Sequence, residues 1–214
     1  MNKDNVLTRI EEIAMFIPPY KTIADVGCDH GYLIISAFED QGILKAYAID
    51  NKKGPIDSAI HNLKNKVYFD KVVFSLSDGI SEIGSDTECV VIAGMGGILI
   101  SEILDKDLKN VKRLILEPNR DQKEVRMKIS KLGFIITNEK IVFEKGKYYE
   151  IIVCDRSDEK IEYTDMELEF GPCLLKEKSL YFKEKWFSIY ESLKDIDNDE
   201  VKKKLERIKK VLWK

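Results

Sequence analysis

The sequence predicts an α/β fold: a doubly wound sheet of seven strands followed by a C-terminal helical hairpin. Three observations support this prediction. Short apolar runs alternate with amphipathic helical segments between residues 22 and 132, as in right-handed βαβ crossovers of a parallel sheet. Two longer runs then flank a glycine turn, as in a β-hairpin. Beyond Asp155, apolar residues recur at helical spacing in two further segments.

The individual elements follow from this pattern in chain order. A first helix is expected over residues 8–16, ended by Pro18 and Pro19. Strands are expected at 22–28, 45–50, 72–76, 89–93 and 113–116, with helices at 32–40, 55–65, 97–104 and 121–132. The hairpin is expected to pair 134–144 with 149–155 around the turn Lys145-Gly-Lys147.

The C-terminal part has a different pattern. Residues 156–166 are polar and indicate a linker. Apolar residues then recur at Phe182, Trp186, Ile189 and Leu193, and again between 201 and 212, with an acidic turn over 195–200. We expect two antiparallel helices packed like a short coiled coil, the aromatic residues forming their seam. The sequence therefore predicts two domains, residues 1–156 and 157–214.

Composition limits the class of protein. Hydrophobic residues make up 44% of the chain, which is ample for a core, and the formal net charge is −3, so a nucleic-acid surface has to be a local patch. The four cysteines show no CxxC spacing and there are two histidines, so we expect reduced thiols and no metal site. No apolar stretch is long enough to span a bilayer and residues 1–4 do not lead into a signal peptide. We expect a soluble, cytoplasmic monomer.

The most informative motif is Ile23-Ala-Asp-Val-Gly-Cys-Asp-His-Gly-Tyr-Leu33, a strand that ends in Asp-x-Gly-x-Asp-x-Gly before a helix. This arrangement of Asp25, Gly27, Asp29 and Gly31 is typical of Rossmann-like class I S-adenosylmethionine (SAM) methyltransferases. A dinucleotide site is the competing interpretation, but its fingerprint needs a third glycine. The Asp29 carboxylate would repel a pyrophosphate and suits an ammonium group. An ordinary turn between strand and helix is the other alternative.

Further ligand positions are expected at the carboxyl ends of the following strands. Asp50 ends the second strand, where an acid can accept both ribose hydroxyls. Asp78 and Gly79 follow the third, where an acid can accept a hydrogen bond from an adenine amino group. Each acid alone is as well explained as a turn residue. Three acids at the ends of consecutive strands make coincidence a poorer explanation.

The fourth and fifth strands lead to two more candidate segments. Ala93-Gly94-Met95-Gly96-Gly97 places bare backbone at a helix start, which predicts room for a planar base; a tight turn is the alternative. Asn119, in Leu116-Glu-Pro-Asn119, can offer its amide to a base edge, although a helix cap is the favoured interpretation.

These motifs resemble one family, the bacterial tRNA (adenine(22)-N1)-methyltransferases called TrmK. The resemblance covers nearly the whole chain and rests on Leu7-Thr-Arg9-Ile, the 23–33 loop, Gly54-Pro55, Asp78-Gly79, Ala93-Gly-Met-Gly-Gly97, Leu116-Glu-Pro-Asn119, Tyr149-Glu-Ile-Ile152 and Phe170-Gly-Pro-Cys-Leu-Leu-Lys-Glu-Lys178, with Lys185-Trp186 beyond. Departures are conservative: Cys28 stands where members often have Ser, Gly31 where many have Ala, and Asp50 where some have Glu. The resemblance implies a SAM-dependent enzyme with a C-terminal helical domain.

That activity implies further roles. Methyl transfer to adenine N1 needs the ring nitrogen to be aligned with the methyl group of SAM. The cationic product must then lose a proton from its amino group. Asp29, His30 and Asn119 are the catalytic candidates. Arg9 is a candidate for a carboxylate or phosphate, with a surface ion pair as the favoured alternative. The cofactor-binding set is Arg9, Asp25, Gly27, Asp29, Gly31, Asp50, Asp78, Gly79, Ala93, Gly94, Met95 and Gly96.

A tRNA acceptor would be bound through phosphate contacts. Two basic patches qualify: Arg120, Lys123, Arg126, Lys128 and Lys131 after Asn119, and Lys202, Lys203, Lys204, Arg207, Lys209, Lys210 and Lys214 in the terminal helix. A solvated face is the alternative for both, and the terminal patch is favoured because few acids compensate it. The competing functions are methylation of another RNA site, of a protein or of a small molecule, and binding of SAM or RNA without enzymatic activity.

Overall fold

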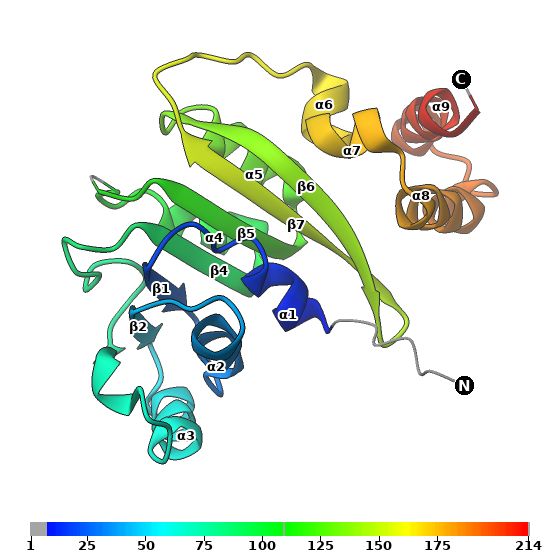
Figure 1. The fold of residues 1–214 in the computed structure, drawn as a ribbon. Helices are drawn as coiled ribbons and strands as arrows, with labels where there is room; N and C mark the ends of the chain where they lie inside the picture. Colours follow the sequence, from blue (N-terminus) through cyan, green and yellow to red (C-terminus); the bar gives the residue numbers. More distant parts are fainter. Residues whose placement is uncertain (1–7, 109, 214) are drawn as a thin grey trace.

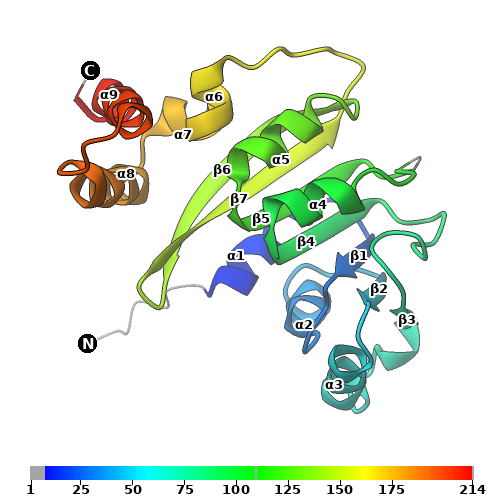
Figure 2. The ribbon, with the colours of Figure 1, turned by 180° about the vertical axis from the view of Figure 1, so that it is seen from behind.

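One seven-stranded sheet runs through the molecule, with helices on both of its faces (Figures 1 and 2). The computed structural model describes residues 8–108 and 110–213. The strand order is β3-β2-β1-β4-β5-β7-β6, from β3 (Val72–Leu76), β2 (Lys45–Asp50), β1 (Thr22–Val26), β4 (Cys89–Gly96), β5 (Arg113–Arg120), β7 (Lys147–Arg156) and β6 (Phe134–Glu144). The first five are parallel, and β7 is antiparallel to both β5 and β6. The predicted doubly wound sheet is confirmed.

Each face of the sheet has its own apolar core. Helices α1 (Arg9–Ala14), α2 (Tyr32–Glu39) and α3 (Lys53–Leu63) bury residues such as Ile13, Ile34 and Leu63 on one face. Helices α4 (Gly97–Ile103) and α5 (Gln122–Ile129) bury Ile100 and Val125 on the other. Because α2 and α4 leave the adjacent strands β1 and β4 toward opposite faces, a crevice opens where those strands end.

Four helices, rather than the two expected, follow the sheet. Helices α8 (Leu180–Leu193) and α9 (Asp199–Trp213) are the predicted pair, and α6 (Asp165–Phe170) and α7 (Pro172–Glu177) precede them beyond the β6 edge of the sheet (Figure 1). The expected linker over 156–166 ends early, because Thr164 and Glu167 form a capping box that starts α6.

The aromatic stripe of α8 is more than a seam between two helices. Phe182 and Trp186 are buried together with Phe170 of α6 and Ile141 of β6, as well as with Ile208 of α9. The C-terminal helices therefore pack on the hairpin edge of the sheet as well as on each other.

Buried charges join the same two parts. Arg126 of α5 is fully buried and donates from Nε to Glu139 Oε1 at 2.7 Å and from Nη2 to Glu150 Oε2 at 2.5 Å. The other oxygen of Glu139 accepts the backbone N–H of Cys173 at 2.8 Å, and the other oxygen of Glu150 pairs with Lys185 of α8. These contacts cross residue 156, and the domain boundary placed there stays a prediction.

Removal of Arg126 tests this network. Arg126→Met leaves the Glu139 carboxylate buried without its cation and Glu150 with Lys185 alone, so we expect the free energy of unfolding in urea to fall by about 3–5 kcal/mol. Arg120→Met is the matched control, because its side chain is 80% exposed and its ion-pair distance to Asp121 is 3.5 Å; we expect a change below about 0.5 kcal/mol. A loss of less than about 1 kcal/mol for Arg126→Met would contradict the assigned role.

Candidate functional site

A cavity of about 630 Å³ lies at the carboxyl ends of the parallel strands. Twelve of the predicted site residues line it: Arg9, Asp25, Gly27, Asp29, His30, Asp50, Asp78, Gly79, Ala93, Gly94, Met95 and Asn119. They come from α1, from the carboxyl ends of the parallel strands and from the turns that follow them, as expected when parallel strands end at one edge of a sheet. The volume lies within the range of small-molecule and cofactor sites.

The two other predicted glycines do not line the cavity. A Cβ at Gly31 would lie 3.0 Å from Leu63 and 3.3 Å from Ala59, so this glycine lets α2 begin close to α3. A Cβ at Gly96 would lie 3.4 Å from the Arg120 side chain. Both glycines thus face protein packing.

The loop after β1 is folded tightly against its neighbours. Gly27 has φ +81° and Asp29 has φ +43°, and the backbone N–H groups of Gly27 and Cys28 both donate to the Ile49 carbonyl, at 2.8 and 3.1 Å. A Cβ at Gly27 would collide with the terminal methyl group of Met95. The conformation therefore favours glycine there, and the flexible Met95 side chain fills the space beside it.

Carboxylates dominate the charge of the cavity. Asp25 is 5% exposed, and burial, followed by the nearby Asp50 and Asp29 carboxylates, raises its pKa to about 7. Asp78 follows β3 and also lines the cavity, while Asp50 accepts the backbone N–H of Lys52 at 2.9 Å. A cationic ligand would relieve the repulsion among these acids, whereas an anionic one would add to it.

Strand β4 turns sharply near its carboxyl end, at Gly94, which has φ +77°. Its N–H donates to Glu117 Oε2 at 3.0 Å, and its carbonyl accepts the Asn119 side-chain amide at 2.5 Å. Both partners belong to β5, and the pairing of β4 with β5 shifts register on either side of Met95. A Cβ at Gly94 would meet nothing within 4 Å. The turn is thus held from one side and open on the other.

Asn119 and Arg9 differ from the interpretations favoured above. Asn119 does not cap the next helix; Asp121 is at the N-cap of α5, and Asn119 instead holds the Gly94 carbonyl. Arg9 is not confined to a surface ion pair, because its partner Glu117 is fully buried. Its guanidinium also lies 4.4 Å from the centre of the Tyr149 ring.

Glu117 is the residue of this site that sequence reasoning missed. Its Oε2 receives Arg9 Nη1 at 2.5 Å and the Gly94 N–H, while its Oε1 is buried without a partner among the described residues. Burial raises the pKa of Glu117 to about 7, although Arg9 acts in the opposite direction. A lone acid inside the apolar run 114–118 is the signal that could have identified it.

Asp29 and His30 are exposed, whereas the Ser77 hydroxyl is buried. The side chains of Asp29 and His30 are 72% and 49% exposed, with Asp29 Oδ1 and His30 Nε2 3.6 Å apart, so they lie at the solvent rim. Ser77 also lines the cavity, and its hydroxyl is buried without a hydrogen-bond partner in the described part of the chain. An unpaired buried hydroxyl beside a cavity suits a polar ligand atom.

Comparison with known proteins gives the family. Residues 23–214 match the sequence profile of TrmK, described as tRNA (adenine(22)-N(1))-methyltransferase. The chain belongs to the TrmK family. It is 32% identical to the Bacillus subtilis tRNA (adenine(22)-N(1))-methyltransferase over 97% of this chain and 94% of that protein. The family resemblance and the Rossmann-like methyltransferase fold predicted from sequence are confirmed.

Two solved structures of similar proteins carry cofactor-type ligands. A Streptococcus pneumoniae protein in complex with S-adenosyl-L-methionine is 34% identical, with a TM-score of 0.91 over 97% of this chain and 99% of that one. The TrmK of M. capricolum in complex with S-adenosyl-homocysteine is 26% identical, with a TM-score of 0.83 over 97% of each chain.

In the folded protein, several basic residues of the two predicted patches are buried or paired with acids. Arg126 is fully buried and is removed from the patch on α5. The terminal patch is largely compensated by acids, contrary to expectation: Lys202 pairs with Asp197, Lys203 with Glu200, Arg207 with Glu169, and Lys209 with Glu206. Leu7 and Lys214 lie outside the described residues.

In the described ranges, no helix is long and apolar enough to cross a membrane.

The raised pKa of Glu117 predicts a pH-dependent stability difference between the wild type and Glu117→Gln. Between pH 4.5 and about 7 the folded wild type keeps a proton that the unfolded chain has released, so its stability relative to the variant falls as pH rises through this window. Urea unfolding of both proteins at pH 5 and pH 8 measures the difference, expected on the order of 2 kcal/mol. Asp25 is present in both proteins, so its own titration cancels. An equal difference at both pH values would mean that Glu117 is ionised throughout.

Proposed function

We propose that the protein transfers a methyl group from S-adenosyl-L-methionine to N1 of adenine 22 in tRNA. Membership of the TrmK family supports the reaction. The observation that carries the cofactor is the set of acids around the cavity, with Asp25 buried beside Asp50 and Asp29. SAM bears a sulfonium and an ammonium group, which these carboxylates attract. The pyrophosphate of a dinucleotide is negatively charged and would be repelled.

The residues of the cavity suit the parts of this cofactor, which supplies an electrophilic methyl group. Asp50 is proposed to accept hydrogen bonds from the ribose hydroxyls and Asp78 one from the adenine amino group. The buried Ser77 hydroxyl can pair with a polar atom of the same ligand. Gly27, with φ +81°, gives the loop after β1 the left-handed turn with which it lines the cavity.

The acceptor base is proposed to lie in the open space beside Gly94. Adenine N1 carries an in-plane lone pair, so the protein has mainly to fix the plane and distance of the base. Glu117 and Asn119 serve this step as positioning residues, because they hold the N–H and carbonyl of Gly94. Asp29 and His30, at the rim, are the proposed acceptors of the proton that leaves the amino group.

The tRNA must present the base outside its helical stack. Helices α5 and α9 stay candidates for phosphate contacts through the lysines without ion pairs to other described residues, Lys131, Lys204 and Lys210. The cytoplasmic location and the monomeric state stay predictions.

Nucleoside analysis of tRNA tests the proposal directly. Incubation of an unmodified tRNA transcript with the protein and SAM should produce 1-methyladenosine, mapped to position 22 by digestion and mass spectrometry. The same transcript with guanine at position 22 should remain unmethylated. Methylation at another position, or none with the wild-type protein, would overturn the proposed function.

Two aspartates test the cofactor assignment separately from the acceptor. Asp50→Ala and Asp78→Ala each remove a proposed charged hydrogen bond worth about 1.5–3 kcal/mol, so calorimetric titration should find SAM affinity lowered by roughly tenfold to a hundredfold. Asp70→Ala, which changes an exposed acid before β3, is the control and should bind SAM like the wild type. Unchanged affinity in both cavity variants would refute the assignment.

A further inference from the structure

We propose that the tip of the β6–β7 hairpin and the start of α8 form an RNA-binding surface, on which an unpaired nucleobase stacks against Phe143, Tyr148 and Tyr181. This proposal rests on the proposed function, because it names the surface that would hold the tRNA beside the methylation site. We call these three residues the aromatic cluster.

The aromatic cluster combines two strands and a helix. Phe143 of β6 and Tyr148 of β7 face each other across the hairpin, with ring centres 4.7 Å apart. Tyr181 of α8 lies 6.2 Å from the Phe143 ring and 6.4 Å from the Tyr148 ring. Phe143 is 41% exposed and Tyr181 39% exposed. The rings therefore leave aromatic surface open to solvent.

Phe143 and Tyr181 lie outside the apolar core between the hairpin and the C-terminal helices, although Tyr148 packs against it. Ile141, two residues before Phe143 in β6, is buried with Phe182 and Trp186, which are 0% and 5% exposed. The exposed rings of Phe143 and Tyr181 are thus not part of this core. Every base offers a π-face, so exposed aromatic rings can bind unpaired nucleotides whatever their sequence.

Lysines without ion pairs surround the rings. Lys145 and Lys147 lie at the hairpin turn and Lys183 lies in the first turn of α8; all three are exposed, and none forms a salt bridge with another described residue. The nearby Glu144 accepts the backbone N–H of Arg9 at 3.0 Å, and Glu184 accepts the Tyr148 hydroxyl at 3.3 Å. Exposed aromatic rings surrounded by lysines without ion pairs suit a polyanion with exposed bases, such as RNA, better than an apolar protein surface.

The position of the surface relative to the cavity supports the same partner. Successive residues of a strand point to opposite faces, so the pair Phe143 and Tyr148 faces α8, while the adjacent pair Val142 and Tyr149 faces the other way. Tyr149 lines the cavity and lies under Arg9. The aromatic cluster and the cavity are thus the two sides of one hairpin.

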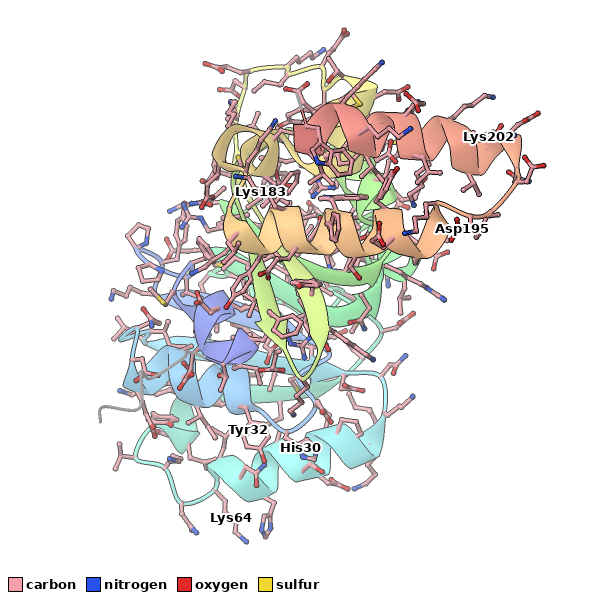
Figure 3. All side chains as sticks on the ribbon, turned by 90° about the vertical axis from the view of Figure 1, so that its right-hand side faces the viewer. His30, Tyr32, Lys64, Lys183, Asp195 and Lys202 are labelled. Atoms are coloured by element: carbon pink, nitrogen blue, oxygen red, sulfur yellow. The ribbon has the colours of Figure 1, made fainter. Side chains whose placement is uncertain are left out.

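Figure 3 looks onto the end of the molecule where these parts meet. In this view the tip of the β6–β7 hairpin is seen below α8, the helix of Lys183, and above the labels of Tyr32 and His30 at the cavity rim. An RNA that inserts one base beside Gly94 could place a neighbouring unpaired nucleotide on the aromatic cluster across the hairpin. The lysines would then contact the phosphates that join the two nucleotides.

The test uses two variants of the full chain. Phe143→Leu/Tyr181→Leu keeps apolar surface but removes two rings, and we expect affinity for the unmodified tRNA to fall about fivefold to a hundredfold. Lys145→Ala/Lys147→Ala/Lys183→Ala should reduce the slope of log affinity against log salt by about two, at roughly 0.7 for each phosphate that a lysine no longer neutralises. Calorimetric SAM affinity and the unfolding midpoint should stay at wild-type values in both.

A matched control changes three exposed lysines elsewhere, Lys71, Lys160 and Lys176, and should leave tRNA affinity and its salt slope unchanged. Wild-type tRNA affinity and slope in both test variants would overturn the proposed surface, as would a change in oligomeric state without a change in RNA binding. If the wild type fails to methylate tRNA while the variants still weaken RNA binding, the proposed function fails and the surface stands.

Discussion

The ion pairs of Arg126 hold the two parts of the molecule in one arrangement. Its guanidinium is fully buried between Glu139 of β6 and Glu150 of β7, and Lys185 of α8 reaches the second oxygen of Glu150. Buried charges are costly unless all of them are paired, and a different placement of α8 against the hairpin would remove Lys185 and leave Arg126 as the single partner of the two buried carboxylates. Because Glu150 follows Tyr148 and Tyr149 in β7, this one network also fixes the strand whose two faces carry the cavity wall and the aromatic cluster.

A second constraint acts at the edge where the parallel strands end. Glu117 ties the backbone of Gly94 to Arg9 of α1 and is buried with a raised pKa, as is Asp25. Neither acid is placed for stability, since burial disfavours the ionised form of both. Strain and unfavourable burial of this kind concentrate at functional sites, where surrounding structure compensates for them. The cavity thus combines the buried Asp25 with the carboxylates of Asp29, Asp50 and Asp78, and Glu117 holds the backbone of its open wall at Gly94.

Local patterns were enough to predict the sheet and most of the cavity, because strands and glycine turns have a sequence signal that does not depend on distant residues. The same patterns misassigned Arg126, because a charged residue is expected to be exposed and its two partners lie far along the chain, in β6 and β7. Part of the charge compensation in α9 could have been read from the sequence, since Lys203 follows Glu200 by three residues. The ion pair between Arg207 and Glu169, 38 residues apart, could not be read from local spacing. Short helices such as α6 were missed because six residues show little periodicity.

The opposite charge demands of a cofactor cation and an RNA polyanion explain why the two sites lie on different faces of the hairpin. The acids that suit the cofactor would repel phosphates brought into the cavity, so an RNA can insert a neutral base there but not its backbone. Cations that bind the flanking phosphates must therefore stand apart from those acids, and at physiological salt charges are largely screened beyond about 8 Å. Lys145, Lys147 and Lys183 do not line the cavity and lie instead at the hairpin turn and in the first turn of α8. The β6–β7 hairpin thus stands between the acids that suit the cofactor and the lysines that suit RNA, with Tyr149 on one face and Tyr148 on the other.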